Sequence, residues 1–265
     1  MKKLLLLATL PLFVACQEKG NKNETNSQAT NNTAQIVEET STEENPLNIS
    51  PISHATMVMQ WGDTIIYTDP VGGAEAFAGQ PEAQLILVTD IHGDHLNVET
   101  LEAVQGGATI IAPKAVADEL PEAMKASVMV LNNGEETTVM GFTVAAIPMY
   151  NLPESPDSRH TKGRGNGYVI SKDGMRVYVS GDTEDIPEMR NLKDIDVAFV
   201  CMNLPYTMDV DAAADAVIEF APKTVYPYHY RGKGGLSDVD KFKNLVEGAE
   251  VNTEVRLLDW YPNRS

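Results

Sequence analysis

Thr89–His95 reads TDIHGDH, and this stretch decides the fold. It follows the apolar run AQLILV (83–88), which is continuous in the way expected for a strand buried on both faces. Two histidines and two aspartates therefore lie just past the end of a strand, where a turn can aim their side chains at one point. Imidazole and carboxylate are ligands of Zn²⁺ and similar ions, so the stretch predicts a metal site.

The rest of the folded region alternates between strand-like and helix-like segments. Helices are expected at 97–104, 114–120, 184–190, 209–221 and 237–248. Strands are expected at 55–61, 63–70, 83–89, 108–113, 127–131, 142–148, 167–171, 176–182, 196–202, 223–230 and 254–260. This strand-rich alternation indicates an α/β fold in which helices cover sheets.

The beginning of the chain reads as a targeting segment. Residues 1–15 have a basic start and a short apolar core, which predicts a signal peptide, and the following Cys16 completes a sequence similar to a bacterial lipobox. The alternative is an ordinary signal peptide with an incidental cysteine. Residues 16–46 are polar and predict a disordered tether, and the folded domain is expected at 47–265. Together these features predict an extracytoplasmic protein, lipid-anchored to a bacterial membrane.

The formal net charge of −18 limits the classes of partner. A strongly acidic protein repels polyanions, which argues against general binding to nucleic acid or to an anionic membrane surface. Contact with a membrane is therefore expected only through a lipid at Cys16. A small anionic substrate held by a local basic cluster stays compatible with this charge. The sequence carries no indication of the oligomeric state.

Further candidate ligands follow other predicted strands. Asp182 lies in SGDTED and His229 in YPYHYRG, each at the end of a strand. Any one of the five histidines alone would ordinarily be a surface or core residue. Several of them beside carboxylates at strand ends favour a shared site, although the spacing alone does not tell which strand ends converge.

The ordered motifs HATM, YTDP, TDIHGDH, SRHTKGRGNGY, SGDTED and YPYHYRG resemble the metallo-β-lactamase superfamily. The branch they resemble most contains L-ascorbate-6-phosphate lactonase and N-acylphosphatidylethanolamine phospholipase D. The resemblance runs from about Leu47 to the C-terminus. It implies a four-layered αββα sandwich with a hydrolytic site for one or two metal ions at one edge of the two sheets.

The resemblance also implies roles for particular residues. His92 would bind a first metal ion, Asp94 and His95 would bind a second, Asp182 would bridge both ions, and His229 would complete the second site. Asp69 in YTDP would support the site without binding metal, and His54 in HATM would lie close to it.

The sequence departs from the superfamily pattern at two positions. Asp90 stands where the opening histidine of the motif is usual; a carboxylate there still binds metal but shifts preference from Zn²⁺ toward Mn²⁺ or Fe²⁺. The third histidine of the family is missing from AIPMYN, where Tyr150 and Asn151 stand. His160 is expected to fold back and serve as that ligand, the alternative being that it contacts only substrate or solvent.

Clues to the substrate are few. Basic residues bracket His160 and His229, and they form either a collar for phosphate or carboxylate or two solvated loops. They are Arg159, Lys162, Arg164, Arg231 and Lys233. Tyr206 in NLPYTM is expected either to cover the pocket or to pack within its loop.

The function expected from these observations is hydrolysis of an ester, lactone, phosphodiester or amide by a metal-bound hydroxide. Asp94 is the candidate catalytic residue that orients the nucleophile and accepts its proton. Zn²⁺ is the expected ion, with Mn²⁺ and Fe²⁺ as alternatives. A non-catalytic lipoprotein that uses the same fold to bind a ligand or partner is the competing hypothesis.

Overall fold

The structure is a computed structural model that describes residues 47–262. The predicted signal peptide, Cys16 and the predicted tether lie outside these residues. No helix within 47–262 is both long enough and apolar enough to cross a membrane.

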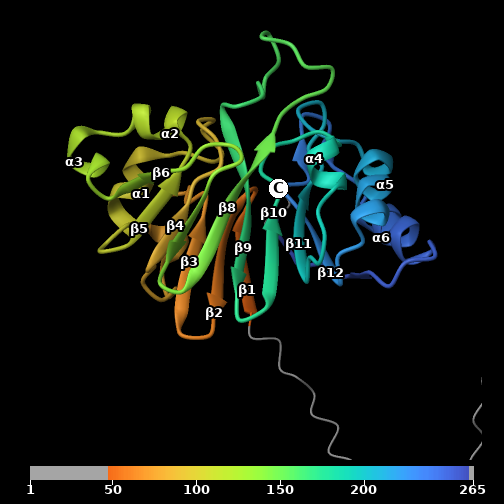
Figure 1. Ribbon diagram of the computed structural model, residues 1–265, viewed down its shortest axis with the longest axis horizontal. Coiled ribbons are helices and arrows are strands. Elements are labelled where there is room, and N and C mark those ends of the chain that lie inside the picture. Colours follow the sequence, from red (N-terminus) through yellow and green to blue (C-terminus); the bar gives the residue numbers. More distant parts are fainter. Residues whose placement is uncertain (1–46, 263–265) are drawn as a thin grey trace, which may run out of the picture. The chain divides into compact units, whose positions relative to one another are not determined.

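Two mixed sheets form the centre of the domain (Figure 1). The first sheet runs, in spatial order, through β1 (Leu47–Ser53), β2 (Thr56–Trp61), β3 (Thr64–Thr68), β4 (Leu85–Leu87), β5 (Thr109–Ala112) and β6 (Val128–Val130). The strands from β1 to β3 are antiparallel, and those from β3 to β6 are parallel.

The second sheet has the order β15 (Glu254–Val255), β12 (Thr224–Tyr228), β11 (Val197–Cys201), β10 (Met175–Val179), β9 (Gly165–Lys172), β8 (Phe142–Met149) and β7 (Glu136–Val139). The strands from β10 to β15 are parallel and those from β7 to β10 are antiparallel. A separate short hairpin is formed by β13 (Arg231–Gly232) and β14 (Gly235–Leu236).

Helices cover the outer face of each sheet (Figure 1). The first sheet is flanked by η1 (Ala74–Phe77), α1 (Val98–Val104), α2 (Lys114–Glu119) and α3 (Glu122–Lys125). The second is flanked by α4 (Pro187–Arg190), α5 (Val210–Phe220) and α6 (Val239–Glu247). The order helix, sheet, sheet, helix is the predicted αββα sandwich, and the prediction of fold class is confirmed.

Side-chain alternation along β4 explains the layering. Leu85 and Leu87 belong to the core between the sheets, whereas Ile86 and Val88 pack in a separate core under the helices of the first sheet. Successive residues of a strand point to opposite faces, so an unbroken apolar run serves both cores. The rings of Trp61 and Phe142 meet edge to face across the inter-sheet core, with centroids 5.2 Å apart.

The helices begin at side chains that satisfy their free backbone amides. Asn97 accepts a hydrogen bond from the amide of Thr100 at the start of α1, and Asp209 accepts one from Ala212 at the start of α5. Such caps stabilise a helix by about 1 kcal/mol. The helix α5 then buries its alanine-rich face, and its Phe220 packs edge to face on Tyr178 of β10.

Several strands differ from expectation: β7, β13 and β14 lie outside the predicted strand ranges, as does β1. The predicted strand at 254–260 is paired only over β15, because the chain leaves the sheet after two residues and Leu257 becomes exposed. The strand β1 was not expected, since Pro51 and polar residues interrupt its apolar pattern. It forms nevertheless because it pairs along its length with β2.

Candidate metal centre

Strand ends from both sheets bring the predicted site residues to one edge of the sandwich. Asp69 directly follows β3, and the TDIHGDH segment follows β4. Asp182 follows β10, and His229 follows β12. Parallel strands end at the same edge of a sheet, which is why residues far apart in the sequence meet here.

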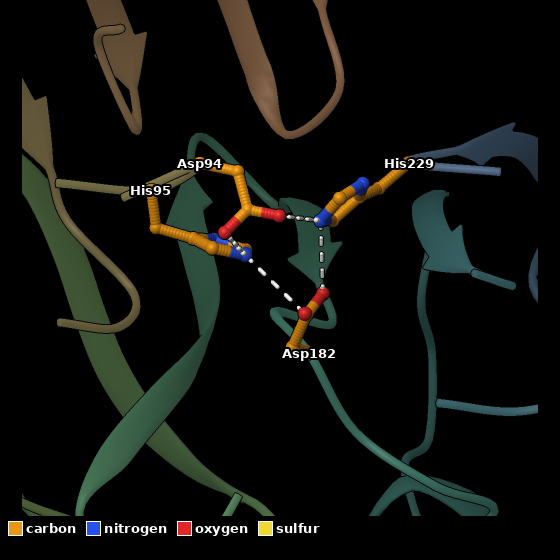
Figure 2. Close-up of side chains that lie close together, drawn as sticks. All are labelled: Asp94, His95, Asp182 and His229. Atoms are coloured by element: carbon orange, nitrogen blue, oxygen red, sulfur yellow. Dashed lines mark ion pairs between the residues drawn. The ribbon is translucent and has the colours of Figure 1, made fainter. Parts of the chain in front are cut away.

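Four of these side chains form what we call the Asp182 cluster: Asp94, His95, Asp182 and His229. Figure 2 shows them pointing toward one another, and one ligand atom from each lies within 4.8 Å of the others. Asp182 Oδ1 is 3.3 Å from His229 Nε2, and its Oδ2 is 3.4 Å from His95 Nε2. Asp94 Oδ2 lies 3.4 Å from His229 Nε2. Two imidazoles and two carboxylates thus surround one point.

Asp69 and Thr89 hold the far side of the His95 ring. Asp69 Oδ2 lies 2.9 Å from His95 Nδ1 and accepts a hydrogen bond of 2.6 Å from the Thr89 hydroxyl. The backbone amide of Thr89 donates to Asp69 Oδ1. A carboxylate on one imidazole nitrogen fixes the tautomer and turns the other nitrogen toward a metal. Asp69 thus contacts the nitrogen of His95 that points away from the cluster.

The electrostatics of the Asp182 cluster favour a bound cation. Burial opposes charge on His95, yet the carboxylates of Asp182 and Asp69 raise the pKa of His95 well above its usual value. Burial would likewise raise the pKa of Asp182, but His229 and His95 hold that pKa well below the usual range. The cluster thus takes up positive charge. His95 Nε2 faces the carboxylates of Asp182 and Asp94, at 3.4 Å and 4.0 Å, where a metal ion could take the place of the proton on the ring.

A second group, which we call the Asp90 cluster, contains Asp90, His92 and His160. Asp90 Oδ2 lies 2.6 Å from His92 Nδ1 and 3.9 Å from His160 Nε2. His160 Nε2 is also 3.3 Å from Asp182 Oδ2, so Asp182 lies between the two clusters. Arg164 donates to both oxygens of Asp90, from Nε at 3.1 Å and from Nη2 at 2.9 Å.

His160 folds back beside Asp90 and His92. Its amide donates to the side chain of Asn151 at 2.8 Å, and the amide of Asn151 donates to the carbonyl of His160 at 2.9 Å. This paired contact closes the loop between the two residues. The His160 ring is buried; its Nε2 faces Asp182, and its Nδ1 has no hydrogen-bond partner within residues 47–262.

Three site residues have a left-handed backbone, with φ of 50° at His54, 46° at Asp69 and 46° at His229. This region is costly for residues other than glycine and often marks functional positions. At Asp69 and His229 the conformation ends a strand abruptly and turns the side chain into the site.

The remaining candidate residues lie around the clusters without joining them. The His54 ring packs edge to face on His229, with centroids 5.3 Å apart, and its Nδ1 is 3.4 Å from the Tyr261 hydroxyl. Burial and His229 lower the pKa of His54 to about 4, so its ring is neutral at neutral pH. Arg231 stacks over Tyr261 at 4.4 Å.

The basic residues predicted to form a collar contact different groups and do not all face the clusters. Lys162 pairs with Glu154 and Glu188, away from both clusters. Arg159 stacks on the Tyr206 ring at 4.6 Å. Tyr206 also accepts a hydrogen bond on its carbonyl from Asn151, so it packs within the loop framework. Of the five basic residues, Arg164 is the one that enters a cluster.

Three residues near the site were not anticipated. Asn203, whose Nδ2 is 3.2 Å from His229 Nε2, lies two residues past the buried strand β11 and could have been found by the same strand-end pattern as Asp182. Thr89 lies within the quoted motif, but its contacts with Asp69 depend on the neighbouring strand. Tyr261 follows the last strand and carries no local signal for a site.

The chain is similar to known proteins over most of its length. A family model described as a beta-lactamase superfamily domain matches residues 48–229. A UPF0173 metal-dependent hydrolase of Thermococcus onnurineus is 32% identical over 209 residues, which are 76% of this chain and 92% of the relative. A similar hydrolase of Pyrococcus abyssi is 33% identical over 206 residues, covering 74% and 90% of the two chains.

Solved structures agree with these matches. The crystal structure of a proposed metal-dependent hydrolase from Parabacteroides distasonis is 37% identical with a TM-score of 0.70, and the match covers 80% of this chain and 92% of that one. The metallo-beta-lactamase fold protein YhfI from Bacillus subtilis has a TM-score of 0.62 at 12% identity, over 81% and 97% of the chains. The second match concerns the fold alone.

Proposed function

Because the chain belongs to the metallo-β-lactamase superfamily and to its UPF0173 family of metal-dependent hydrolases, we propose that it hydrolyses an ester, lactone, phosphodiester or amide in a small anionic substrate. The observation that carries this proposal is the convergence of Asp94, His95, Asp182 and His229 within 4.8 Å. Membership of the family does not identify the bond, since one fold hosts many reactions.

We assign a divalent ion to the Asp182 cluster. Its two imidazoles and two carboxylates suit Zn²⁺, and the carboxylates also make Mn²⁺ and Fe²⁺ acceptable. The chemistry that a bound ion supplies here is activation of a water molecule near neutral pH and stabilisation of negative charge on the substrate.

The side chains around the ion have distinct tasks. Asp69 keeps Nδ1 of His95 engaged, so that the other nitrogen faces the centre. Asp94 is the most exposed member of the cluster, with its side chain 37% accessible against 3% for Asp182. An accessible carboxylate beside the ion can orient the attacking water and accept its proton. We therefore assign that catalytic role to Asp94.

An anionic substrate is supported by the positions of two arginines. Arg164 reaches the Asp90 cluster, and Arg231 lies over Tyr261 beside His54. In a protein of net charge −18, such local positive groups admit a small anion while the overall field repels nucleic acid. Phosphate and carboxylate are the groups that arginine binds in a forked geometry. This substrate class agrees with the branch that contains the lactonase and the phospholipase, and we propose that the chain belongs to that branch.

We also propose that the protein is extracytoplasmic and anchored by lipid at Cys16. The support is the sequence alone, namely the basic start, the short apolar core and the lipobox-like LFVAC. Radiolabelled palmitate should enter the membrane fraction of cells that make the wild type. The Cys16→Ala variant should carry no label, and equal labelling of both would refute the anchor.

Hydrolysis is tested with a panel of lactones, phosphodiesters, esters and amides, each in an anionic and a neutral form. We expect turnover of at least one anionic substrate that is lost on chelation and restored by Zn²⁺ or Mn²⁺. The variant His229→Ala should lose it, whereas Asp118→Ala, a change on the exposed surface of α2, should keep it. Metal-loaded protein that turns over nothing yet binds anions would favour the non-catalytic binding protein.

A further inference from the structure

We propose that the guanidinium of Arg164 occupies the place of the first metal ion, so that each chain holds one ion in the Asp182 cluster and a fixed arginine beside it. The Asp90 cluster is then an anion-binding half of the site rather than a second metal site. This inference rests on the proposed function, because it assumes that the Asp182 cluster holds the ion.

The oxygens of Asp90 are already engaged. Arg164 binds both of them in a forked geometry, at 3.1 Å and 2.9 Å, and His92 Nδ1 lies 2.6 Å from Oδ2. Asp90 is fully buried. A metal ion on this carboxylate would have to displace the arginine or share an oxygen with it, so the residues of the Asp90 cluster do not fit an ion.

The backbone fixes Arg164 opposite Asp90. Gly165, the next residue, lies so close to Thr89 that an added Cβ would be 2.8 Å from the Thr89 carbonyl oxygen. The amide of Asn166 donates to that same oxygen at 2.9 Å. Thr89 directly precedes Asp90, so the segments that carry the two charged residues are joined beside the ion pair. Asn133 adds a hydrogen bond to the Gly165 carbonyl at 2.8 Å.

The two clusters differ in net charge. The Asp182 cluster contains two carboxylates and no cationic lysine or arginine, so a dication brings it to neutrality. In the Asp90 cluster, the one carboxylate is already neutralised by Arg164. A second dication would lie beside a guanidinium and would be repelled by it.

The arginine supplies part of what a second metal ion would supply. Its side chain remains 20% accessible, so part of the guanidinium is open to a substrate while Nε and Nη2 hold Asp90. The buried His160 ring faces Asp182 at 3.3 Å, and its Nδ1 has no hydrogen-bond partner within residues 47–262. These donors are placed to hold a phosphoryl or carboxylate oxygen of the substrate while the neighbouring ion activates water.

The test is the metal content of the full chain purified without chelator. Elemental analysis of the wild type and of Asp90→Asn should give about one equivalent each, and His229→Ala should give a small fraction of that. The double variant Asp90→His with Arg164→Gln restores a histidine and removes the competing cation. It should rise toward about two equivalents.

A second readout needs no variant. In Mn²⁺-loaded wild type, electron paramagnetic resonance should show an isolated ion, whereas two ions sharing Asp182 would give an exchange-coupled spectrum. Two equivalents of metal per wild-type chain with an exchange-coupled spectrum would overturn the inference. A single ion that is lost in Asp90→Asn and kept in His229→Ala would overturn it as well. Wild type without any ion after Zn²⁺ or Mn²⁺ loading would instead refute the proposed function itself.

Discussion

Asp69 and His95, which are 26 positions apart, are joined by a contact of 2.9 Å between Oδ2 and Nδ1, and both side chains are inaccessible to solvent. Each residue comes from the end of a different strand of the first sheet. The contact therefore couples the position of the His95 imidazole, which follows β4, to the end of the neighbouring strand β3.

Replacing Asp69 by asparagine should weaken metal binding without removing the ion. Loss of the carboxylate leaves His95 less basic and less well oriented, and such changes typically cost about 10- to 100-fold in metal affinity. Competition with a chromophoric chelator measures the dissociation constant. Asp240→Asn, an exposed position in the first turn of α6, is the matched control and should bind as the wild type does. Unchanged affinity in Asp69→Asn would contradict the supporting role.

Metal binding should stabilise the fold. An ion at about 100 times its dissociation constant adds about 2.7 kcal/mol, which corresponds to a rise of about 5 to 10 °C in Tm for a domain of this size. Thermal unfolding of chelator-treated protein with and without Zn²⁺ measures this rise. Asp182→Asn should abolish it and Asp118→Asn should retain it; an equal rise in both would place the ion elsewhere.

Gly165→Ala should destabilise the domain. The added methyl would lie 2.8 Å from the Thr89 carbonyl oxygen and 2.4 Å from Met149 Cε, and overpacking of this kind costs about 1 to 3 kcal/mol. Urea unfolding measures the loss. Gly107→Ala is the matched control, since its methyl would meet no atom within 4 Å. Equal stability of the two variants would show that the close approach of the segments does not constrain the site.

The ion pair of Asp90 predicts how stability depends on pH. Burial alone would raise the pKa of Asp90, but the hydrogen bond from His92 and the charges of His95, His92 and Arg164 lower it to about 2. The pKa of an aspartate is about 4 in an unfolded chain. Ionised Asp90 therefore contributes fully to the free energy of unfolding above that pH, and this contribution disappears as the pH falls through about 2.

The expected size is about 2 kcal/mol, measured as the difference in free energy of unfolding between metal-free wild type and Asp90→Asn. This difference should be constant from pH 7 to about 5 and shrink as the pH is lowered through 4 and 3. A difference that grows on acidification would show that Asp90 is protonated in the folded protein.

The layered architecture was predictable because its strongest elements are locally encoded. The run Ala83–Val88 is apolar at every position but one, and a segment buried on both faces has to be so. The ends of the sheets were less predictable. The strand β1 depends on pairing with β2 and not on its own pattern, and β15 is cut short where the chain leaves the sheet.

The candidate site was predictable only in part. The position of ligands at strand ends follows from the sequence, but the convergence of Asp182 and His229 with His95 required the family resemblance. The ion pair between Arg164 and Asp90 spans 74 positions. No local pattern links those two residues, since their meeting depends on the packing of Gly165 against Thr89, which lies just past the end of β4.

The left-handed backbone at His54, Asp69 and His229 has an evolutionary consequence. Glycine at any of the three would relieve backbone strain. At each position the native residue therefore makes the folded protein less stable than glycine would. Laboratory selection for heat resistance alone should therefore accumulate glycine at these positions and erode turnover. Selection that also demands activity should hold them unchanged and find its gains elsewhere.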